Sequence, residues 1–285
     1  MPRELLLVVS NPTPMPNFAI LLPPAEGKKH GGNPLAPDMF DYRSSDTFNY
    51  FNALNPERRI LIDAVQQIIE TSEEEALQDI FGVKGEFLKD ALQANRAVYS
   101  APLLSALDRY SLGVMYKAMD FVGLPTGAQR RLLENGVIVS GLFGLLRPDD
   151  LIPNYRLRID ATLPEIGKVS AYWKSHLSAS LNETLQGRFV WDFLPAVHRE
   201  AWDDDHSYRR LVRVKFFVEE NGERKAVSHN VKPLRGQLVN FIVRETVEEL
   251  EALLDWEHPA GFRYDEAAST YDEKTKTGVI EMVKK

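Results

Sequence analysis

The segment VIVSGLFGLLRPDDLIPNYRLRID, residues 137–160, decides the expected fold because it joins a buried run to a charged loop. Its first ten residues are apolar or small, which is typical of a strand covered on both faces. The loop that follows contains three arginines and three aspartates. Loops at strand ends commonly hold ligands in α/β proteins. The alternative is that these arginines and aspartates pair with each other and fix the loop without a ligand.

Segments on both sides of residues 137–160 predict further strands and helices. An Asn-Gly pair at 221–222 between alternating runs predicts a hairpin within residues 209–229. Helical spacing, broken at Pro102 and Gly113, occupies much of residues 56–135. Helices and strands mix without strict alternation, so we expect one mixed α/β (α+β) domain over residues 1–285, with a mixed sheet and a helical insertion at about 56–135. Further strands are predicted at 4–9, 18–22, 188–194 and 278–284, and further helices at 170–187 and 233–256.

Bulk composition excludes several classes of function. The chain of 285 residues has no cysteine, which excludes thiolate nucleophiles and cysteine-ligated metals. No run approaches the ~20 apolar residues of a membrane span, and the apolar run near the start has no cleavage site after it. We therefore expect a cytoplasmic protein with no membrane partner.

Charge is unevenly distributed along an acidic chain. The formal net charge of −7 disfavours general nucleic-acid binding, which needs a basic surface. Residues 209–244, however, contain nine Lys or Arg against three Glu, whereas residues 245–285 contain eleven acids against five bases. A basic strip on an acidic chain is compatible with a specific site for an anion.

Three charged segments are candidates for that site. In LLPPAEGKKHGG, residues 21–32, a predicted strand leads to Glu26 and Lys28, which suit acid/base chemistry or charge pairing. In the second segment Arg147 and Arg156 are candidates to hold a phosphate or carboxylate by two-pronged contacts, with Asp150 orienting one of them and Tyr155 beside them. For both segments, a solvated or self-paired loop is the structural alternative.

The third segment is SHNVKPLRGQL, residues 228–238, which opens a predicted helix. His229, Lys232 and Arg235 then lie near a helix N-terminus, whose free amides favour anions. The six histidines do not show the spacing of a metal site on one helix, and we predict no metal. The sequence does not define a cofactor or an oligomeric state.

One further element bears on nucleic acids. The segment DFVGLPTGAQRRLLENG, residues 120–136, has the form of a helix-hairpin-helix element, in which backbone amides grip a phosphate. Arg130 and Arg131 lie on the helix that follows. An ordinary connector between two packed helices is the alternative.

Taken together, these segments resemble the YaaA family of peroxide stress response proteins. The matching pieces occur in order over nearly the whole chain, and the long central motif is the most specific of them. They are LLPPAEGK, RYSLGVMYKAMDF, VSGLFGLLRPDDLIPNYRLRI, AYWK and SHNVKPLRGQL.

The resemblance implies a single mixed α/β domain with a helix-hairpin-helix-like element beside a positively charged cleft. It also implies a cytoplasmic protein that binds DNA, lowers free iron and limits oxidative damage. Departures from the family pattern, such as DFLPAVHREAW in place of a serine-containing stretch, leave open a specialised enzyme acting on a phosphorylated or carboxylated small molecule. Its acid/base would be Glu26, Asp150 or His229. The cleft residues that the resemblance carries over are Glu26, Lys28, Arg147, Asp150, Tyr155, Arg156, Lys174, Lys232 and Arg235.

Overall fold

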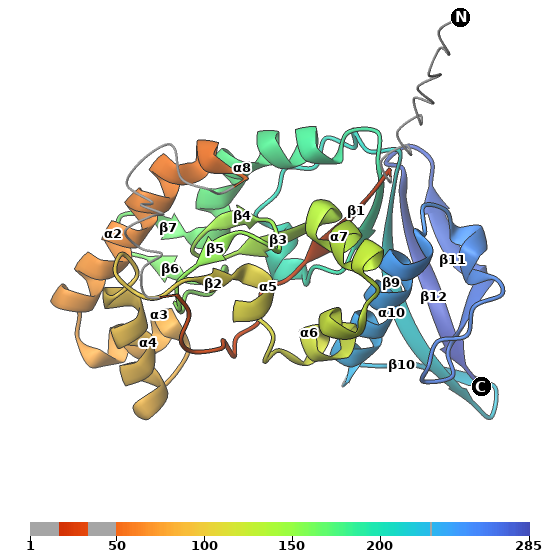
Figure 1. The fold of residues 1–285 in the computed structure, drawn as a ribbon, viewed down its shortest axis with the longest axis horizontal. Helices are drawn as coiled ribbons and strands as arrows, with labels where there is room; N and C mark the ends of the chain where they lie inside the picture. Colours follow the sequence, from red (N-terminus) through yellow and green to blue (C-terminus); the bar gives the residue numbers. More distant parts are fainter. Residues whose placement is uncertain (1–16, 34–49, 229) are drawn as a thin grey trace, which may run out of the picture.

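The computed structural model describes residues 17–33, 50–228 and 230–285; the strand predicted at 4–9 lies outside them. Within these ranges, eight strands form one mixed sheet in the order β11-β12-β9-β8-β1-β3-β4, with β10 paired to β9 (Figure 1). The expected mixed α/β fold is confirmed. The strands are β1 (Phe18–Leu22), β3 (Gly136–Ser140), β4 (Gly144–Leu146), β8 (Phe189–Asp192), β9 (Arg210–Glu220), β10 (Glu223–Ala226), β11 (Arg263–Asp272) and β12 (Thr277–Lys284).

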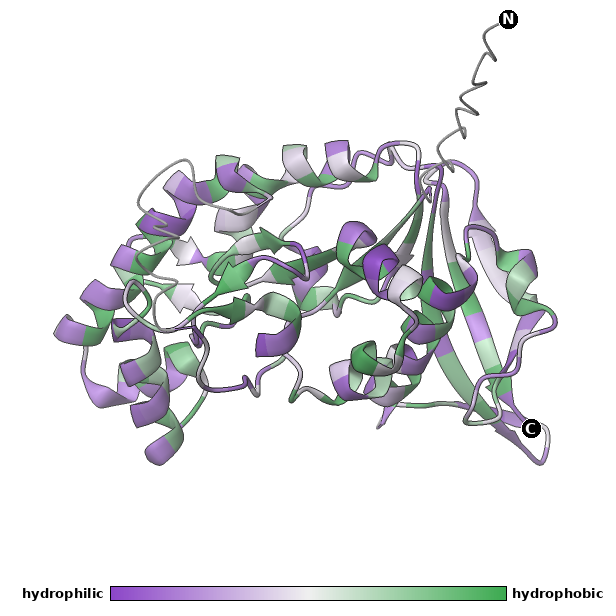
Figure 2. Cartoon of the chain, viewed as in Figure 1, coloured by the Kyte–Doolittle hydropathy of each residue, from purple (hydrophilic) through white to green (hydrophobic). Residues whose placement is uncertain are grey.

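The centre of the sheet consists of parallel strands. β1 lies between β3 and β8, and Ile20 is opposite Gly136 on one side and Trp191 on the other. Every residue of these three strands is buried, as their continuous apolar runs predict for strands covered on both faces (Figure 2). The single strand expected over 137–146 is in fact two, because the chain reverses at 141–143 and β4 returns antiparallel to β3.

Helices cover both sides of this sheet (Figure 1). α8 (Val169–Leu185) lies on one side, and α6 (Val114–Met119), α7 (Thr126–Asn135) and α10 (Val231–Glu245) lie on the other. Residues 56–135 are largely helical, as expected, and α2 to α4 form one end of the molecule. The remaining elements are η1 (Asn52–Leu54), α2 (Asn55–Thr71), α3 (Glu74–Phe81), α4 (Glu86–Arg96), β2 (Leu104–Ser105), α5 (Ala106–Arg109), η2 (Phe121–Gly123), β5 (Leu151–Ile152), β6 (Thr162–Leu163), β7 (Gly167–Lys168), α9 (Ala196–Arg199) and η3 (Leu250–Leu253).

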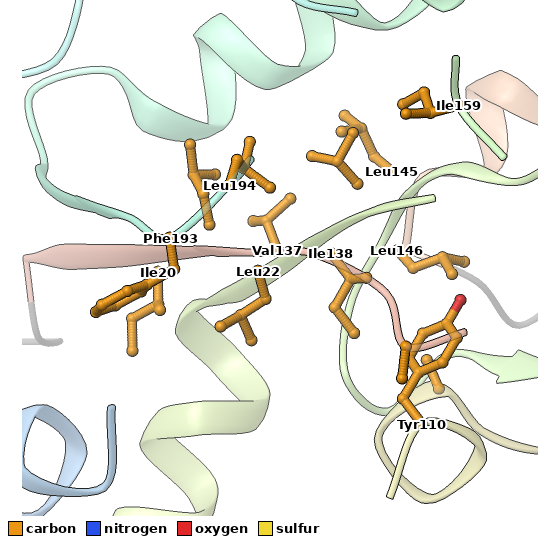
Figure 3. Packing of buried hydrophobic residues seen from close by; sticks show 14 of the residues in the cluster. Ile20, Leu22, Tyr110, Val137, Ile138, Leu145, Leu146, Ile159, Phe193 and Leu194 are labelled. Carbon is orange, nitrogen blue, oxygen red and sulfur yellow. The ribbon is translucent and has the colours of Figure 1, made fainter. Parts of the chain in front are cut away.

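The core fills the space between the sheet and these two helical layers. Side chains alternate along each strand, so Val137 and Ile138 point to opposite sides of β3, while Ile20 and Leu22 share one side of β1 (Figure 3). The four residues are at most 3% exposed. The strand periodicity thus sends apolar side chains toward both α8 and α7.

The edge of the sheet was harder to predict than its centre. The Asn221-Gly222 hairpin between β9 and β10 is confirmed, with positive φ at both residues, as this type of turn requires. β11 was not predicted, because it is an edge strand with many exposed residues and no clear alternation. The helix expected over 233–256 ends at Glu245, since Thr246 adopts a left-handed conformation with φ 57°.

Residues 120–136 form two helices joined by a short turn, but a helix-hairpin-helix element is not confirmed. The amides of Gly123 and Leu124 donate to the carbonyl oxygens of Asp120 and Phe121 at 3.1 and 3.2 Å. Arg131 donates from Nε to the carbonyl oxygen of Val243 at 2.6 Å, at the end of α10. These groups therefore hold the turn and the neighbouring helix in place.

Candidate functional site

A cavity of about 500 Å³ lies at the carboxyl ends of β1, β3 and β8. In the parallel centre of the sheet, β3 follows β1 in the chain and lies on one side of it, whereas β8 comes later and lies on the other side. Where the chain changes sides in this way, the loops at the carboxyl ends of the strands separate, and α/β proteins bind ligands in the crevice between them. The lining comes from six parts of the chain. They are residues 23–28 after β1, 112–116 at the start of α6, 141 directly after β3, 155–160 further along, 195, 197 and 198 after β8, and 232 and 235 on α10.

Close backbone packing fixes the position of these segments. Tyr116 donates its hydroxyl to the carbonyl oxygen of Pro23 at 2.8 Å, which holds the start of the loop after β1. A side chain at Gly141 would collide with the carbonyl oxygen of Leu157, so the glycine allows the two segments to meet at the cavity wall. Gly236 likewise lets α10 approach the backbone of α6 at Met115.

The cavity collects cations that are far apart in the sequence. Its described lining includes five Lys or Arg residues and two acids, Glu26 and Asp160. Arg158 and Asp160 pair with each other, with Nε 2.9 Å from Oδ1, so their charges largely offset. The remaining cations face a single carboxylate, which favours an anionic occupant. They are Lys28, Arg156, Lys232 and Arg235.

Lys28 has an unusual environment for a lysine. Its Nζ lies 4.3 Å from the ring centroid of Tyr155 and 5.8 Å from that of Tyr110. No hydrogen bond or ion pair joins the side chain to any residue of the described ranges. Burial, reinforced by the charge of Arg156, lowers the pKa of Lys28 to about 7. A large fraction of Lys28 is therefore a neutral amine at neutral pH.

Tyr155 forms the wall beneath Lys28. It is 2% exposed, and its hydroxyl is 2.6 Å from that of Tyr110 and 2.7 Å from that of Ser140. Burial raises the pKa of Tyr155 to about 12, so the phenol stays protonated. Its ring is locked in position, and its face is available to a cation.

Arg156 lies close to Glu26, which is in the loop after β1. Arg156 donates from Nε to the carbonyl oxygen of Phe81 at 3.1 Å, and its terminal nitrogen lies 3.9 Å from a carboxylate oxygen of Glu26. The side chain of Glu26 is 81% exposed, so this contact is a weak ion pair in solvent. An incoming anion can therefore compete for Arg156.

Lys232 and Arg235 line the cavity from α10, where they are one turn apart. Lys232 is exposed and forms no hydrogen bond or ion pair with the part of the chain that the structure describes. Arg235 donates to the carbonyl oxygen of Phe193 at 3.4 Å, and its buried Nε has no described partner. A buried donor without an acceptor is costly, and an acceptor group in the cavity is one way to satisfy it.

His198, which the sequence did not single out, also lines the cavity. Burial lowers its pKa to about 4, so the imidazole is neutral at physiological pH. Its buried Nδ1 has no hydrogen-bond partner among residues 17–33, 50–228 and 230–285. The signal that could have identified His198 is its place after the buried strand β8, which matches that of Lys28 after β1.

Arg147 and Asp150 lie outside the lining of this cavity, so the structure does not bring them together with the candidates above. The guanidinium of Arg147 stacks 3.5 Å from the ring centroid of Tyr50 and donates to the carbonyl oxygen of Leu133 at 3.1 Å. Asp150 is 1% exposed and accepts the backbone amides of Arg147 and Tyr50 at 2.7 and 3.0 Å. Burial raises the pKa of Asp150 to about 6. The Arg-Pro-Asp-Asp turn is thus held both by a contact between its own residues and by contacts with Tyr50 and Leu133.

Two further candidates remain, and the described residues place only one of them. Lys174 lies on α8 outside the lining and pairs with Asp203 at 3.0 Å. His229 lies outside the described residues. Of the predicted candidates, the structure brings together Glu26, Lys28, Tyr155, Arg156, Lys232 and Arg235.

Two features of the described residues bear on the kind of site. Within them, no group of three or more His, Asp or Glu side chains is placed to hold a metal ion. No helix in these ranges combines the length and the apolar composition needed to cross a membrane.

The fold and cavity define a mixed α/β protein with a candidate ligand site at the carboxyl edge of its parallel strands. The family described as peroxide stress protein YaaA matches residues 18–268. The chain therefore belongs to the YaaA family, and the resemblance is confirmed.

Individual relatives match over most of their length. A UPF0246 protein of Corynebacterium glutamicum is 33% identical over 234 residues, which cover 78% of this chain and 84% of the relative. A UPF0246 protein of Streptomyces coelicolor is 28% identical over 79% of this chain and 82% of its own. An uncharacterized protein of Campylobacter jejuni is 27% identical over 82% and 88%, respectively.

Proposed function

We propose that this YaaA-family protein binds a small phosphorylated or carboxylated molecule in the cavity at the carboxyl edge of β1, β3 and β8. The observation that carries the proposal is the gathering of Arg156, Lys232 and Arg235, with the partly protonated Lys28, around one cavity in a chain of net charge −7. The anion would occupy the space between Arg156 and the first turns of α10. Glu26 is the acid/base candidate among the lining residues.

The enclosure of the cations favours a small molecule over a polymer. The Nε of Arg235 is buried, and Lys28 lies against the ring of Tyr155. A duplex cannot place its phosphates in a cavity of about 500 Å³, whereas this volume lies within the usual range for small-molecule sites. Electrostatic attraction is also stronger in such a partly enclosed site than on an open surface.

The test is calorimetric titration with inorganic phosphate, pyruvate and a sugar phosphate at low ionic strength. We expect saturable binding of at least one probe, with affinity reduced about five- to tenfold in Lys232→Ala, which removes one nearby charge. Lys225→Ala is the matched control, because Lys225 is also exposed but lies on β10, outside the cavity. Equal losses in both variants, or no saturable binding of any probe, would refute the proposal.

DNA binding is a second candidate, favoured by the exposed start of α7. Residues 125–127 are exposed, and Val122 in the preceding turn is 88% exposed. Free amides at a helix start favour a phosphate. The neighbouring Arg130 pairs with Glu134 at 2.6 Å, however, which reduces the charge available to DNA.

Fluorescence anisotropy with a labelled duplex tests this second candidate. Binding through phosphates predicts an affinity that falls steeply with salt and is weaker in Arg130→Ala. An affinity that is unchanged in Arg130→Ala but reduced in Lys232→Ala would place the duplex at the cavity rim instead. The absence of binding at low salt would remove DNA from the proposed function.

At the level of the cell, we propose that the protein acts in the cytoplasm and limits damage by peroxide and iron. The family description, peroxide stress protein YaaA, supports the role in peroxide stress. A deletion strain should then lose viability in hydrogen peroxide. Complementation with Lys28→Met and Lys232→Ala would show whether the cavity is needed for that protection. Full rescue by both variants would mean that protection from peroxide does not depend on the cavity.

A further inference from the structure

The side chain of Lys28 stands apart from the other lysines for which the structure gives contacts. Its sequence neighbour Lys29 is held by Asp108 at 2.9 Å and is half exposed. Lys28 instead faces the cavity over the ring of Tyr155, with no described acceptor for its N–H groups. Simple anion binding is served better by a permanently charged guanidinium, which Arg156 and Arg235 already provide. The placement of Lys28 therefore suits a different task.

We propose that Lys28 is a nucleophile that forms an imine with an aldehyde or ketone carrying a carboxylate or phosphate. This inference rests on the proposed binding of small anions and names their class: 2-oxo acids, glyoxylate-like aldehydes or phosphorylated aldehydes. Burial against Tyr155 and the proximity of Arg156 keep much of the amine unprotonated at neutral pH, which such a nucleophile requires.

The covalent step is balanced without an oxidant or reductant. The lone pair of the neutral amine attacks the carbonyl carbon, and the carbonyl π electrons move to oxygen. One N–H proton is transferred to that oxygen, which gives a neutral carbinolamine. The hydroxyl group then leaves with the second N–H proton as water, and the nitrogen lone pair forms the carbon–nitrogen double bond. The net reaction converts one amine and one carbonyl group into one imine and one water.

The surroundings of Lys28 suit both partners of this reaction. The ring face of Tyr155, 4.3 Å from Nζ, stabilises the cationic protonated imine as it does an ammonium. Arg156, Lys232 and Arg235 are available to hold the carboxylate or phosphate of the carbonyl compound. Glu26, which lines the same cavity, is placed to exchange a proton beside an imine that acts as an electron sink.

Reductive trapping tests the proposal on the full-length protein. The protein is incubated at pH 7 with glyoxylate and sodium cyanoborohydride, which reduces an imine to a stable secondary amine, and labelled residues are mapped by mass spectrometry. We expect Lys28 to be labelled at least about tenfold faster than Lys29, because an ordinary lysine is almost fully protonated at this pH. The rate at Lys28 should reach half its maximum near pH 7.

Two variants and a second probe make the outcomes decisive. Lys28→Met should abolish the fast label, whereas Lys29→Ala should retain it. Uncharged propanal should label Lys28 more slowly than glyoxylate does, and Lys232→Ala should remove that difference. Fast labelling that does not depend on probe charge or Lys232 would support the nucleophile and refute the anion site. Saturable anion binding by calorimetry with no preference for Lys28 over Lys29 would refute the nucleophile and leave the anion site standing.

Discussion

Replacing Arg147 by alanine should destabilise the protein without weakening anion binding. The change removes a charged hydrogen bond to Leu133, worth about 1.5–3 kcal/mol, and stacking on Tyr50, worth roughly 0.5–1 kcal/mol. The ion pair with Asp149 at 3.3 Å is partly solvated and adds little. We therefore expect a loss of about 2–4 kcal/mol in the free energy of unfolding.

Urea denaturation and differential scanning calorimetry measure this loss. In a chain of this size it corresponds to a fall in Tm of roughly 3–7 °C. Lys232→Ala is the reciprocal variant, because Lys232 is exposed and without a described partner, so its removal should change stability by less than about 0.5 kcal/mol. A near-normal Tm for Arg147→Ala together with lost phosphate binding would refute the assignment of Arg147 to a structural loop.

Three other variants test the packing and charge of the site. Lys28→Met should raise the free energy of unfolding by roughly 1–3 kcal/mol below pH 7, because the folded-state pKa of Lys28, about 7, lies below the ordinary 10.5. The gain should fade between pH 7 and pH 10.5, and a gain independent of pH would contradict this. Gly236→Ala should cost about 1–3 kcal/mol, because its methyl group meets the carbonyl oxygen of Met115, and a loss below 0.5 kcal/mol in urea melts would refute this close approach. Tyr155→Phe should lower the free energy of unfolding by about 1–2 kcal/mol, because the hydroxyl contacts with Tyr110 and Ser140 are lost. The variant should still be labelled at Lys28 by reductive trapping, and loss of this labelling would show that the hydroxyl is needed.

The sequence by itself determined the central strands of the fold. The apolar run at 18–22 is typical of a strand covered on both faces, and the run at 188–194 also predicts a strand. Both strands lie at the parallel centre of the sheet. The Asn-Gly pair fixed the β9–β10 hairpin through local backbone preference. The ordered motifs also determined membership of the YaaA family.

Tertiary structure alone decided which charged residues meet. Arg147 and Arg156 are equally plausible anion ligands in the sequence, but Arg147 is held between Tyr50 and Leu133 while Arg156 reaches the cavity. His198 and Lys28 are far apart in the chain and lie at one cavity because β1 and β8 are neighbouring parallel strands. Local preference is set by nearby residues and can be read along the chain, whereas the partner of a charged side chain depends on contacts between distant segments.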